Sequence, residues 1–460
     1  MKTLLINPIT RNLSLSSPDV GLGYLARALK RENHQVHILD CVNAKMTFDK
    51  FEAYIAALDV DVIGFRVFST DILSAKKSVQ VVRKRLPRVQ IVLGGAHPSA
   101  FPEQTLEYFE EADFAIRGEA EKGLVDLFRH LTDPGAIRKE QIPGLIWREN
   151  GTIRCNPPLF YENLDDLGSP DWDLINPRDY PYQTSYFAQS KIVAPLIMTR
   201  GCPYQCTFCS CRAVTGHQIR AHSASCIIRQ IQLLQSKFGV REVCFIDDNF
   251  LALKSLATEL CEQIIQQKID IAWSCFGIRL DLVDEPILRL MEKAGCYLLT
   301  VGIESGSQRI LDHMKKKLTL EQIEEKLKLI KAQTRIKVVG NFILGYPLEN
   351  GEDIRKTIRF ARRLPLYGAN FFPFHPTPGT EIFDQMMDGK LPENINWNTM
   401  GQDRKPFVPA GLSRKYFTWL FVLAFLSFYG RPEAIRNVLG AAGSPGKIKY
   451  LISRIGKIMT

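Results

Sequence analysis

The segment Thr199-Arg-Gly-Cys-Pro-Tyr-Gln-Cys-Thr-Phe-Cys209 places three cysteines in a short polar stretch that also holds a glycine and a proline. Cys202, Cys206 and Cys209 follow the spacing CxxxCxxC, and three thiolates this close can hold one soft metal centre. The preceding residues 193–198 are apolar and predict a short strand. The cysteines are therefore expected on a loop at the carboxyl end of a strand, where α/β folds place their chemistry.

The residues after the cysteines predict a helix. Ser223 is a good N-cap, and Gly239 is a good terminator. Ile227, Ile231 and Phe238 recur at helical spacing between them, so one face of this helix is expected to be buried.

Spacing alone leaves more than one use for the three cysteines. An iron–sulfur cube with three protein ligands keeps one iron open to bind and cleave a small molecule, whereas zinc would need a fourth ligand. Cys211 or His217 could supply that ligand. A disulfide is disfavoured, because the start of the chain has no recognisable secretory signal and its eleven cysteines point to a reducing compartment.

Further segments, in order along the chain, resemble the radical S-adenosylmethionine (SAM) enzymes. In the cysteine segment the aromatic Phe208 precedes the third cysteine, as in that family. The other segments are Phe245-Ile-Asp-Asp-Asn-Phe250, Gly302-Ile-Glu-Ser-Gly306, Gly340-Asn-Phe-Ile-Leu-Gly-Tyr-Pro347 and Pro376-Thr-Pro-Gly-Thr380. Together with the amino-terminal region they resemble the cobalamin-binding subfamily, and the resemblance covers residues 1 to about 385.

Composition agrees with a globular protein of two or three domains. Of the 460 residues, 45% are hydrophobic and 23% are charged, which is enough for real cores. The net charge of +10 is concentrated in residues 411–460, which carry eight basic residues and one acidic residue. Because the rest of the chain is near neutral, no nucleic-acid partner is expected.

Residues 1–140 predict a doubly wound parallel sheet of flavodoxin or Rossmann type, because short apolar strands alternate with amphipathic helices. The expected strands are residues 3–6, 36–39, 62–65, 91–93 and 114–116. Such a sheet binds its ligand beyond the carboxyl ends of its strands. A nucleotide site and a receiver-type or purely structural domain stay open, although no GxGxxG follows the first strand.

The resemblance implies that this domain binds cobalamin, with Ser69, Thr70, Gly94 and Gly95 near the nucleotide tail. The pattern DxHxxG, by which other cobalamin proteins offer a histidine to cobalt, is absent, as is usual in this subfamily. His97 is a further candidate for the metal, or it lies against the tail or on the surface. A domain that has lost its cofactor also stays open.

Residues 141–190 are expected to link two domains. Residues 144–154 predict a hairpin with Asn150-Gly151 at the turn, and several prolines follow. From 191 to 385 the alternation of strands and helices returns, with six expected strands. Six units fall short of an eight-unit barrel and fit the partial (β/α)6 barrel of the resembled family. Residues 386–460 are expected to form a basic, helical carboxyl-terminal region.

The resemblance assigns cofactor-binding roles at the ends of these strands. Phe208 is expected beside the cluster, and Asp247 and Asp248 near the amino group of SAM; the alternative for either aspartate is a helix N-cap. Glu304 is expected at the ribose of SAM. Its alternative is an ion pair with a neighbour such as Arg279.

The fifth loop of this domain carries Gly345 and Pro347. The resemblance implies that they pack adenine, whereas both residues are also common in simple turns.

The reaction implied by the resemblance needs a [4Fe-4S] cluster, SAM and cobalamin. The cluster, held by Cys202, Cys206 and Cys209, reduces SAM to give a 5′-deoxyadenosyl radical, and methylcobalamin delivers a methyl group to the substrate radical. The expected enzyme is a cytoplasmic radical SAM methyltransferase acting on an unactivated carbon, or less often on phosphorus. Both domains must then face one cavity.

Other functions stay open. Some cobalamin-dependent relatives form rings or carry out oxidative rearrangements without methyl transfer. A tRNA methylthiotransferase is disfavoured, because only Cys41 and Cys155 precede Cys202 and a second cysteine cluster would be needed. A non-enzymatic cobalamin or iron–sulfur sensor would not cleave SAM.

The expected partners are a small-molecule substrate and an electron donor such as flavodoxin or ferredoxin. Residues 416–429 are apolar nearly all round but too short to span a bilayer. We favour a buried helix that covers the partial barrel; the alternative is a helix at the membrane surface, with residues 411–460 making peripheral contact. That alternative would favour a lipid or isoprenoid substrate.

Overall fold

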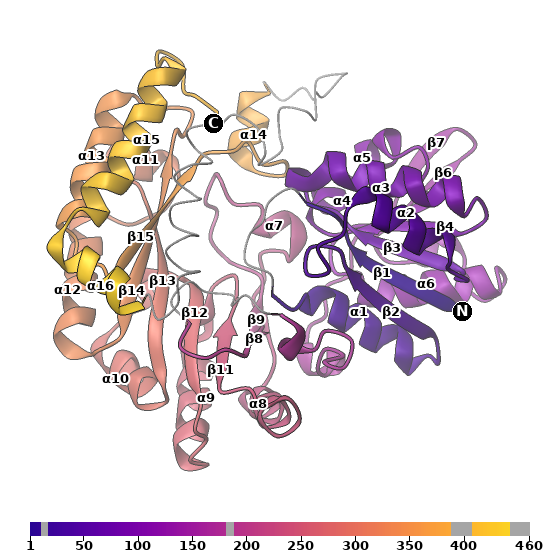
Figure 1. Cartoon of the computed structure of the whole chain (residues 1–460), viewed down its shortest axis with the longest axis horizontal. Helices are drawn as coiled ribbons and strands as arrows, with labels where there is room; N and C mark the ends of the chain where they lie inside the picture. The colour runs from indigo at the N-terminus through magenta and orange to yellow at the C-terminus, as the bar shows by residue number, and fades with distance from the viewer. Residues whose placement is uncertain (11–16, 181–187, 388–406, 442–460) are drawn as a thin grey trace.

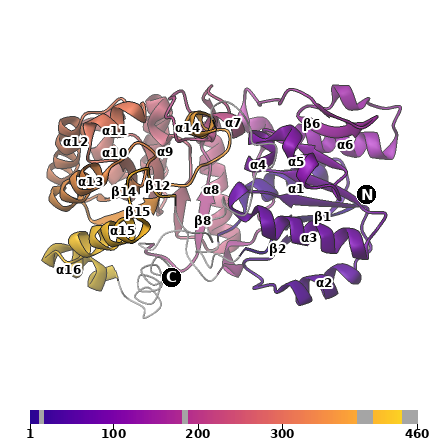
Figure 2. The same ribbon diagram turned by 90° about the horizontal axis from the view of Figure 1, so that it is seen from above.

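Two sheets lie side by side in the computed structural model, which describes residues 1–10, 17–180, 188–387 and 407–441 (Figure 1). The first sheet is built from the amino-terminal residues, and the second from residues 193–373. In the perpendicular view of Figure 2 the helix α8 (Ala224–Phe238) lies on the side of the second half that faces the first.

The first sheet has the strand order β2-β1-β3-β4-β5-β6-β7, and its first five strands are parallel. These five strands are β1 (Lys2–Asn7), β2 (Gln35–Asp40), β3 (Val62–Arg66), β4 (Gln90–Gly94) and β5 (Phe114–Ile116). They lie where the apolar runs predicted them. Both faces of the sheet are covered, so the predicted doubly wound fold is confirmed.

Strand alternation divides the side chains between two cores. Leu4 and Ile6 pack on one face, whereas Leu5 packs on the other. The helices are α1 (Val20–Arg31), α2 (Phe48–Ala56), α3 (Ile72–Arg85), α4 (Ala96–Ala100), α5 (Pro102–Tyr108) and α6 (Glu121–Thr132). Leu22 of α1 and Leu124 of α6 cover the face that holds Leu5.

The predicted hairpin forms from β6 (Leu145–Glu149) and β7 (Thr152–Cys155). Asn150 and Gly151 at its turn have φ values of 48° and 78°, because a tight two-residue turn needs positive φ at both positions. β6 pairs antiparallel with β5, so the hairpin extends the first sheet. Residues 145–155 therefore belong structurally with the first sheet, although we expected them in a separate linker.

The second sheet has six parallel strands in the order β15-β14-β13-β12-β11-β8. The strands are β8 (Val193–Leu196), β11 (Glu242–Phe245), β12 (Ala272–Ile278), β13 (Cys296–Glu304), β14 (Lys337–Leu344) and β15 (Gly368–Pro373). The helices of this half are α8, α9 (Lys254–Gln266), α10 (Glu285–Lys293), α11 (Gln308–His313), α12 (Leu320–Gln333), α13 (Gly351–Arg363) and α14 (Glu381–Met386). Beside them lie the short helix α7 (Cys211–Val214) and the two-stranded ribbon of β9 (Thr199–Arg200) and β10 (Arg220–Ala221). The six parallel strands match the predicted partial barrel.

The helix predicted after the cysteines forms as α8, and both of its predicted capping residues are in place. The hydroxyl of Ser223 accepts a hydrogen bond from Cys226 N, and Gly239 closes α8 with a left-handed φ of 68°. A capping box of Thr319 and Gln322 opens α12.

The helix α15 (Arg414–Tyr429) covers the outer side of the second sheet, next to β15 and α13 (Figure 1). It buries an aromatic face: Phe425 and Phe428 lie edge-on to Phe371 of β15. The short α16 (Pro432–Ala441) follows. Among the described residues, no helix has both the length and the apolar character needed to cross a membrane. The covering helix that we favoured is therefore present.

Candidate active site between the two sheets

A cavity of about 260 Å³ opens where the carboxyl ends of the two sheets meet. From the first half it is lined by strand residues such as Leu5 and Val92, by Gly94 and Gly95, and by Leu22 of α1. From the second half it is lined by Ile197, Thr199, Arg200, Val214, Thr215, Ile246 and Asp248. Both halves of the chain therefore face one cavity, as the expected chemistry requires.

The three cysteines lie on the loop between β9 and α7; they do not line the cavity themselves, whereas Arg200 of β9 and Val214 of α7 do. Cys202 and Cys206 are half-buried, whereas Cys209 is exposed, and none of the three forms a disulfide. Burial raises the pKa of both the Cys202 and the Cys206 thiol. At Cys206 the positive charges of Lys316 and Arg279 oppose this rise. Those cations favour the thiolate, which is the form that binds a metal.

Arg279 was not predicted to approach the cysteine loop. Its guanidinium stacks on the ring of Tyr204 at 3.6 Å from the ring centroid, and its Nη1 lies 4.0 Å from Cys206 Sγ. Its Nη2 also donates to the carbonyl of Lys316 at 2.8 Å. The loop thus carries a fixed positive charge against one of its cysteines.

Thr207 anchors the loop in the second half of the molecule. Its N–H donates to Met314 O at 3.1 Å, its carbonyl accepts from Ile382 N at 2.9 Å, and its hydroxyl lies 2.8 Å from Tyr346 Oη. Tyr346 Oη also lies 2.9 Å from His313 Nδ1. Phe208 packs on the apolar cluster that includes Tyr346, so this ring helps to hold the loop in place.

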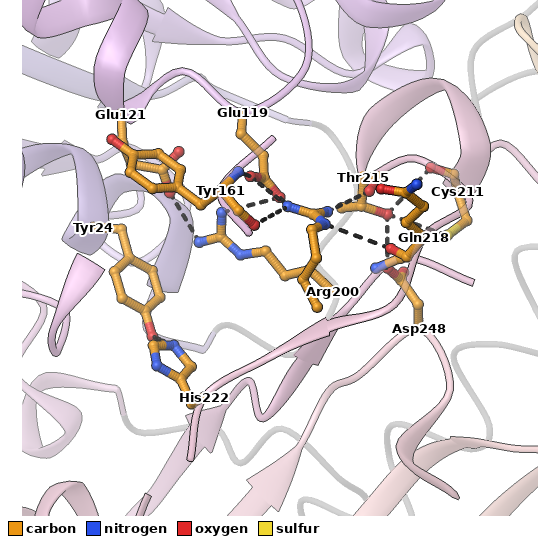
Figure 3. Close-up of polar contacts among 12 residues, drawn as sticks. Tyr24, Glu119, Glu121, Tyr161, Arg200, Cys211, Thr215, Gln218, His222 and Asp248 are labelled. Carbon is orange, nitrogen blue, oxygen red and sulfur yellow. Dashed lines mark hydrogen bonds and ion pairs between the residues drawn. The ribbon is translucent and has the colours of Figure 1, made fainter. Parts of the chain in front are cut away.

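A buried network of charges joins the two halves beside the cavity (Figure 3). Glu119 and Glu121 follow β5, whereas Arg200 and Arg220 belong to β9 and β10. Arg200 Nη2 donates to Glu121 Oε1 at 2.8 Å, and Arg220 Nη1 donates to Glu119 Oε1 at 2.7 Å. All four side chains are buried. No sequence motif indicates this network, although Arg200 lies inside the cysteine segment.

Comparison with known proteins agrees with this geometry. Residues 6–128 match the B12 binding domain, and residues 196–361 match the radical SAM superfamily. An uncharacterized methyltransferase from Pyrococcus horikoshii is 30% identical over 446 residues, which cover 95% of this chain and 94% of the relative. The chain belongs to the cobalamin-binding radical SAM family. It is an enzyme of the radical SAM methyltransferase kind, and its cofactors are a [4Fe-4S] cluster, SAM and cobalamin.

Other members of the family differ in reaction. The cytidylyl-2-hydroxyethylphosphonate methyltransferase of Streptomyces wedmorensis is 26% identical, with 83% of this chain and 80% of the relative covered. The anaerobic magnesium-protoporphyrin IX monomethyl ester cyclase of Rubrivivax gelatinosus is also 26% identical, over 81% of this chain and 66% of the relative.

Two solved structures share the fold. The radical SAM methyltransferase TsrM from Kitasatospora setae, with tryptophan substrate and a SAM analogue bound, has a TM-score of 0.70 at 19% identity. The match covers 84% of this chain and 76% of TsrM. The cobalamin-dependent enzyme OxsB has a TM-score of 0.73 at 17% identity, with 98% and 70% of the two chains covered.

The wall formed by the first sheet suits cobalamin. A Cβ added at Gly94 would meet no atom within 4 Å, so the absence of a side chain there leaves room for a ligand. Arg66, at the end of β3, lines the same cavity and is fixed by Asp19, 2.6 Å away, and by Asn7 Oδ1, 2.7 Å away. Apolar strand residues and a fixed cation are the surroundings that a large, partly apolar ligand requires.

Ser69 and Thr70 are not among the described residues that line the cavity. They lie in a 3-10 helix of residues 69–71, where Ser69 Oγ is 2.9 Å from His97 Nδ1. His97 is fully buried, which excludes the surface position considered for it, and burial lowers its pKa to about 3. Gly95 lines the cavity with a left-handed φ of 104°. A Cβ at Gly95 would lie 3.0 Å from Val67 O.

The two aspartates after β11 have different surroundings. Asp247 is buried and its Oδ1 accepts from Met198 N at 3.1 Å and from Thr199 Oγ1 at 2.7 Å, so it fixes the turn before the cysteine loop. Burial raises the pKa of Asp247 to about 7. Asp248 is exposed, lines the cavity and accepts from Gly201 N at 2.9 Å. Of the two, Asp248 is the one placed to meet a ligand.

Glu304 ends β13 in a left-handed conformation, with φ of 67°. Its carboxylate pairs with Lys316 Nζ at 2.9 Å, whereas Arg279 pairs with Asp281 at 3.1 Å. The ion pair between Glu304 and Arg279 that we considered is therefore wrong. A Cβ at Gly302 would lie 2.2 Å from Glu304 Oε1, so the glycine of the segment 302–306 makes room for this carboxylate.

The loop after β14 is held by a carboxylate that no sequence motif indicates. Glu349 Oε2 accepts hydrogen bonds from Gly345 N at 2.6 Å and from Tyr346 N at 3.0 Å. Glu349 is buried, and burial raises its pKa to about 8. Gly345 has φ of 87°, and a Cβ there would lie 2.8 Å from the ring of Phe417. Pro347 follows half-buried in the same loop. The covering helix α15 thus packs closely against this predicted adenine loop.

Proposed function

We propose that the protein transfers a methyl group from SAM to an unactivated carbon atom of a small molecule. The observation that carries this proposal is the cavity, because it is lined by the cobalamin-binding half and by the residues flanking the cysteine loop. When bound, the cluster and SAM supply a radical that removes hydrogen from carbon, and cobalamin supplies the methyl group. A shared cavity is the arrangement in which one substrate can reach both.

In this proposal separate groups of residues bind the cluster, SAM and cobalamin. Cys202, Cys206 and Cys209 bind the cluster, and Thr207 and Arg279 hold their loop. Asp248, Glu304 and the loop of Gly345 and Pro347 position SAM. Gly94 and Gly95 admit cobalamin. The apolar side chains of the cavity exclude water, which protects a reactive substrate from side reactions.

The proposal is tested with methyl-deuterated SAM. Anaerobically reconstituted, cobalamin-loaded protein is reduced and incubated with small-molecule extracts and lipid extracts of the source cells. We expect release of 5′-deoxyadenosine and a product that carries the deuterated methyl group, both absent from the Cys206→Ala variant. A new product without the label would contradict methyl transfer.

Ring formation or oxidative rearrangement is the second candidate, because cyclases are among the relatives. The same incubation separates the two reactions. A cyclisation product has lost hydrogen relative to its substrate and contains no deuterated methyl group, whatever the label on SAM.

We further propose that α15 touches an anionic membrane surface, which would bring a lipid or isoprenoid substrate to the cavity. While one face of α15 is buried, Trp419 is 54% exposed and Leu426 is 61% exposed on the outer face. Lys415 and Arg436 are exposed nearby in sequence. An outward apolar face with basic neighbours is typical of helices that lie on anionic lipid.

Flotation with vesicles tests this contact. We expect the protein to float with phosphatidylserine-containing vesicles and to remain behind with neutral vesicles. The double variant Trp419→Ser and Leu426→Ser should no longer float with these vesicles. The control double variant Leu159→Ser and Leu233→Ser, which changes two other exposed leucines, should still float. Equal recovery of all proteins would refute the proposal.

We propose flavodoxin or ferredoxin as the electron donor, since Cys209 of the cysteine loop is exposed. Reduced flavodoxin should support SAM cleavage in place of a chemical reductant. Failure of flavodoxin and of ferredoxin, when dithionite succeeds, would exclude both classes of donor.

A further inference from the structure

Three side chains that can each bind a metal lie close together outside the cavity lining. Among the described residues, Asp165, His222 and Cys226 each offer one ligand atom, and these atoms all lie within 4.8 Å of one another. His222 Nδ1 is 3.3 Å from Asp165 Oδ1 and 3.7 Å from Cys226 Sγ. Asp165 belongs to the 3-10 helix of residues 164–167 in the linker, and Cys226 to the first turn of α8.

The two separations from His222 Nδ1 are close to the edges of a metal tetrahedron. Zinc binds nitrogen and oxygen at about 2.0–2.1 Å and sulfur at about 2.3 Å, which places tetrahedral ligand atoms about 3.3–3.6 Å apart. A neutral N–H···O hydrogen bond is usually shorter, about 2.9–3.0 Å. One ring nitrogen therefore faces an oxygen and a sulfur at the spacing that a shared ion would set.

Each of the three side chains also contacts a neighbouring polar residue. His222 Nε2 lies 3.0 Å from Tyr24 Oη (Figure 3), which leaves Nδ1 for an ion. Asp165 accepts from Ser223 N at 2.9 Å and from Ser223 Oγ at 2.6 Å. Gln230 Nε2 lies 3.8 Å from Cys226 Sγ. Outer partners of this kind orient metal ligands and raise metal affinity.

Of the three side chains, that of Asp165 is the most exposed to solvent. His222 is 0% exposed and Cys226 is 6% exposed, whereas the side chain of Asp165 is 28% exposed. An ion can therefore enter beside Asp165, where water can complete its coordination.

We propose that Asp165, His222 and Cys226 bind a divalent ion of the zinc class. A mixed imidazole, thiolate and carboxylate set favours zinc over magnesium or calcium, which prefer oxygen ligands alone. The site is separate from the cysteine loop and does not depend on the proposed reaction. It joins the linker to the start of α8 and, through Tyr24, to α1 of the first half. Its role is to fasten the junction of the two halves next to the cavity.

The test counts metals in the full-length, iron-reconstituted protein. After exposure to excess zinc and desalting, mass spectrometry should find about one zinc per chain in addition to iron. Cys226→Ala and Asp165→Asn should each lower zinc about tenfold and leave iron unchanged. Retained iron shows that these variants are folded. Cys261→Ala, which removes another buried thiol, should leave zinc unchanged.

Cys202→Ala separates the two sites, because it should lose iron and keep zinc. Zinc that is absent from the wild-type protein, or that is lost with Cys202→Ala and kept with Cys226→Ala, would overturn the proposal. Cobalt(II) gives a second readout in cobalamin-free protein whose cysteine loop is occupied by the iron cluster: a thiolate charge-transfer band should appear in the difference spectrum and should vanish in Cys226→Ala. A band that persists in that variant would also refute the site.

Discussion

The guanidinium of Arg200 donates to the carboxylate of Glu121 at 2.8 Å, and this ion pair is buried where the two halves of the chain meet. Arg200 also stacks over the ring of Tyr24, 5.1 Å from its centroid. Because Gly201 and Cys202 come directly after Arg200, the pair fixes the start of the cysteine loop against the first residue of α6.

Glu121→Gln should destabilise the protein. The substitution leaves the Arg200 charge buried with only Glu119, 3.4 Å away, as an ionic partner. Removing one partner of a buried ion pair costs about 3–5 kcal/mol, and we expect the lower end of that range here. The measurement is the midpoint of thermal unfolding. Glu32→Gln breaks the exposed pair with Arg129 and should shift the midpoint little. Equal shifts of the unfolding midpoint in the two variants would show that the buried pair stabilises the protein no more than the exposed pair does.

Arg279 offers a test of the charge around the cysteine loop. Arg279→Gln removes a cation that lies 4.0 Å from Cys206 Sγ, so the reduced, more negative cluster loses stabilisation. We expect a more negative reduction potential and about tenfold slower SAM cleavage. The potential is read by a redox titration followed by electron paramagnetic resonance. Arg289→Gln, on the surface of α10, should change neither value.

The strands and helix ends could be predicted because their signals are local. Buried parallel strands are continuous apolar runs, and Ser223 and Gly239 are caps that act within one helical turn. The cavity position of Asp248 and Gly94 followed from the rule that parallel strands bind ligands at their carboxyl ends.

The charged network could not be predicted in the same way. Arg200 and Glu121 are 79 positions apart, and no pattern near either residue names the other. The partner of Glu304 was missed for a related reason: Lys316 and Arg279 both lie within reach of the cysteine loop, and only the packing decides which cation meets the carboxylate. Long-range polar pairing depends on how the two halves dock.

Asp247 gives the folded protein a pH dependence that Asp247→Asn should remove. Burial raises the pKa of this carboxyl from 3.8 to about 7. The folded state therefore holds a proton that the unfolded state releases, so the contribution to stability is present at low pH and is lost as pH rises toward 7. Unfolding midpoints measured between about pH 5 and pH 7.5 should fall more steeply for the wild type than for Asp247→Asn. Parallel slopes would contradict the raised pKa.

Gly94 separates cofactor binding from folding. Gly94 lines the cavity and a Cβ added there meets no atom within 4 Å, so we expect substitutions at this position to change the unfolding temperature little. Cobalamin needs the same space. We expect Gly94→Ala to weaken cobalamin binding slightly and Gly94→Leu to weaken it by about tenfold or more, because steric overlap grows with side-chain length.

The measurement for this series is the cobalamin absorbance that stays with the protein after gel filtration, with the unfolding midpoint recorded for each variant. Gly123→Leu is the matched contrast, because a Cβ there would lie 2.4 Å from Pro143 O and the protein should unfold at a lower temperature. If Gly94→Leu binds cobalamin as tightly as the wild type, the ligand does not occupy this cavity. The role proposed for the end of β4 would then fail, whereas the fold would stand.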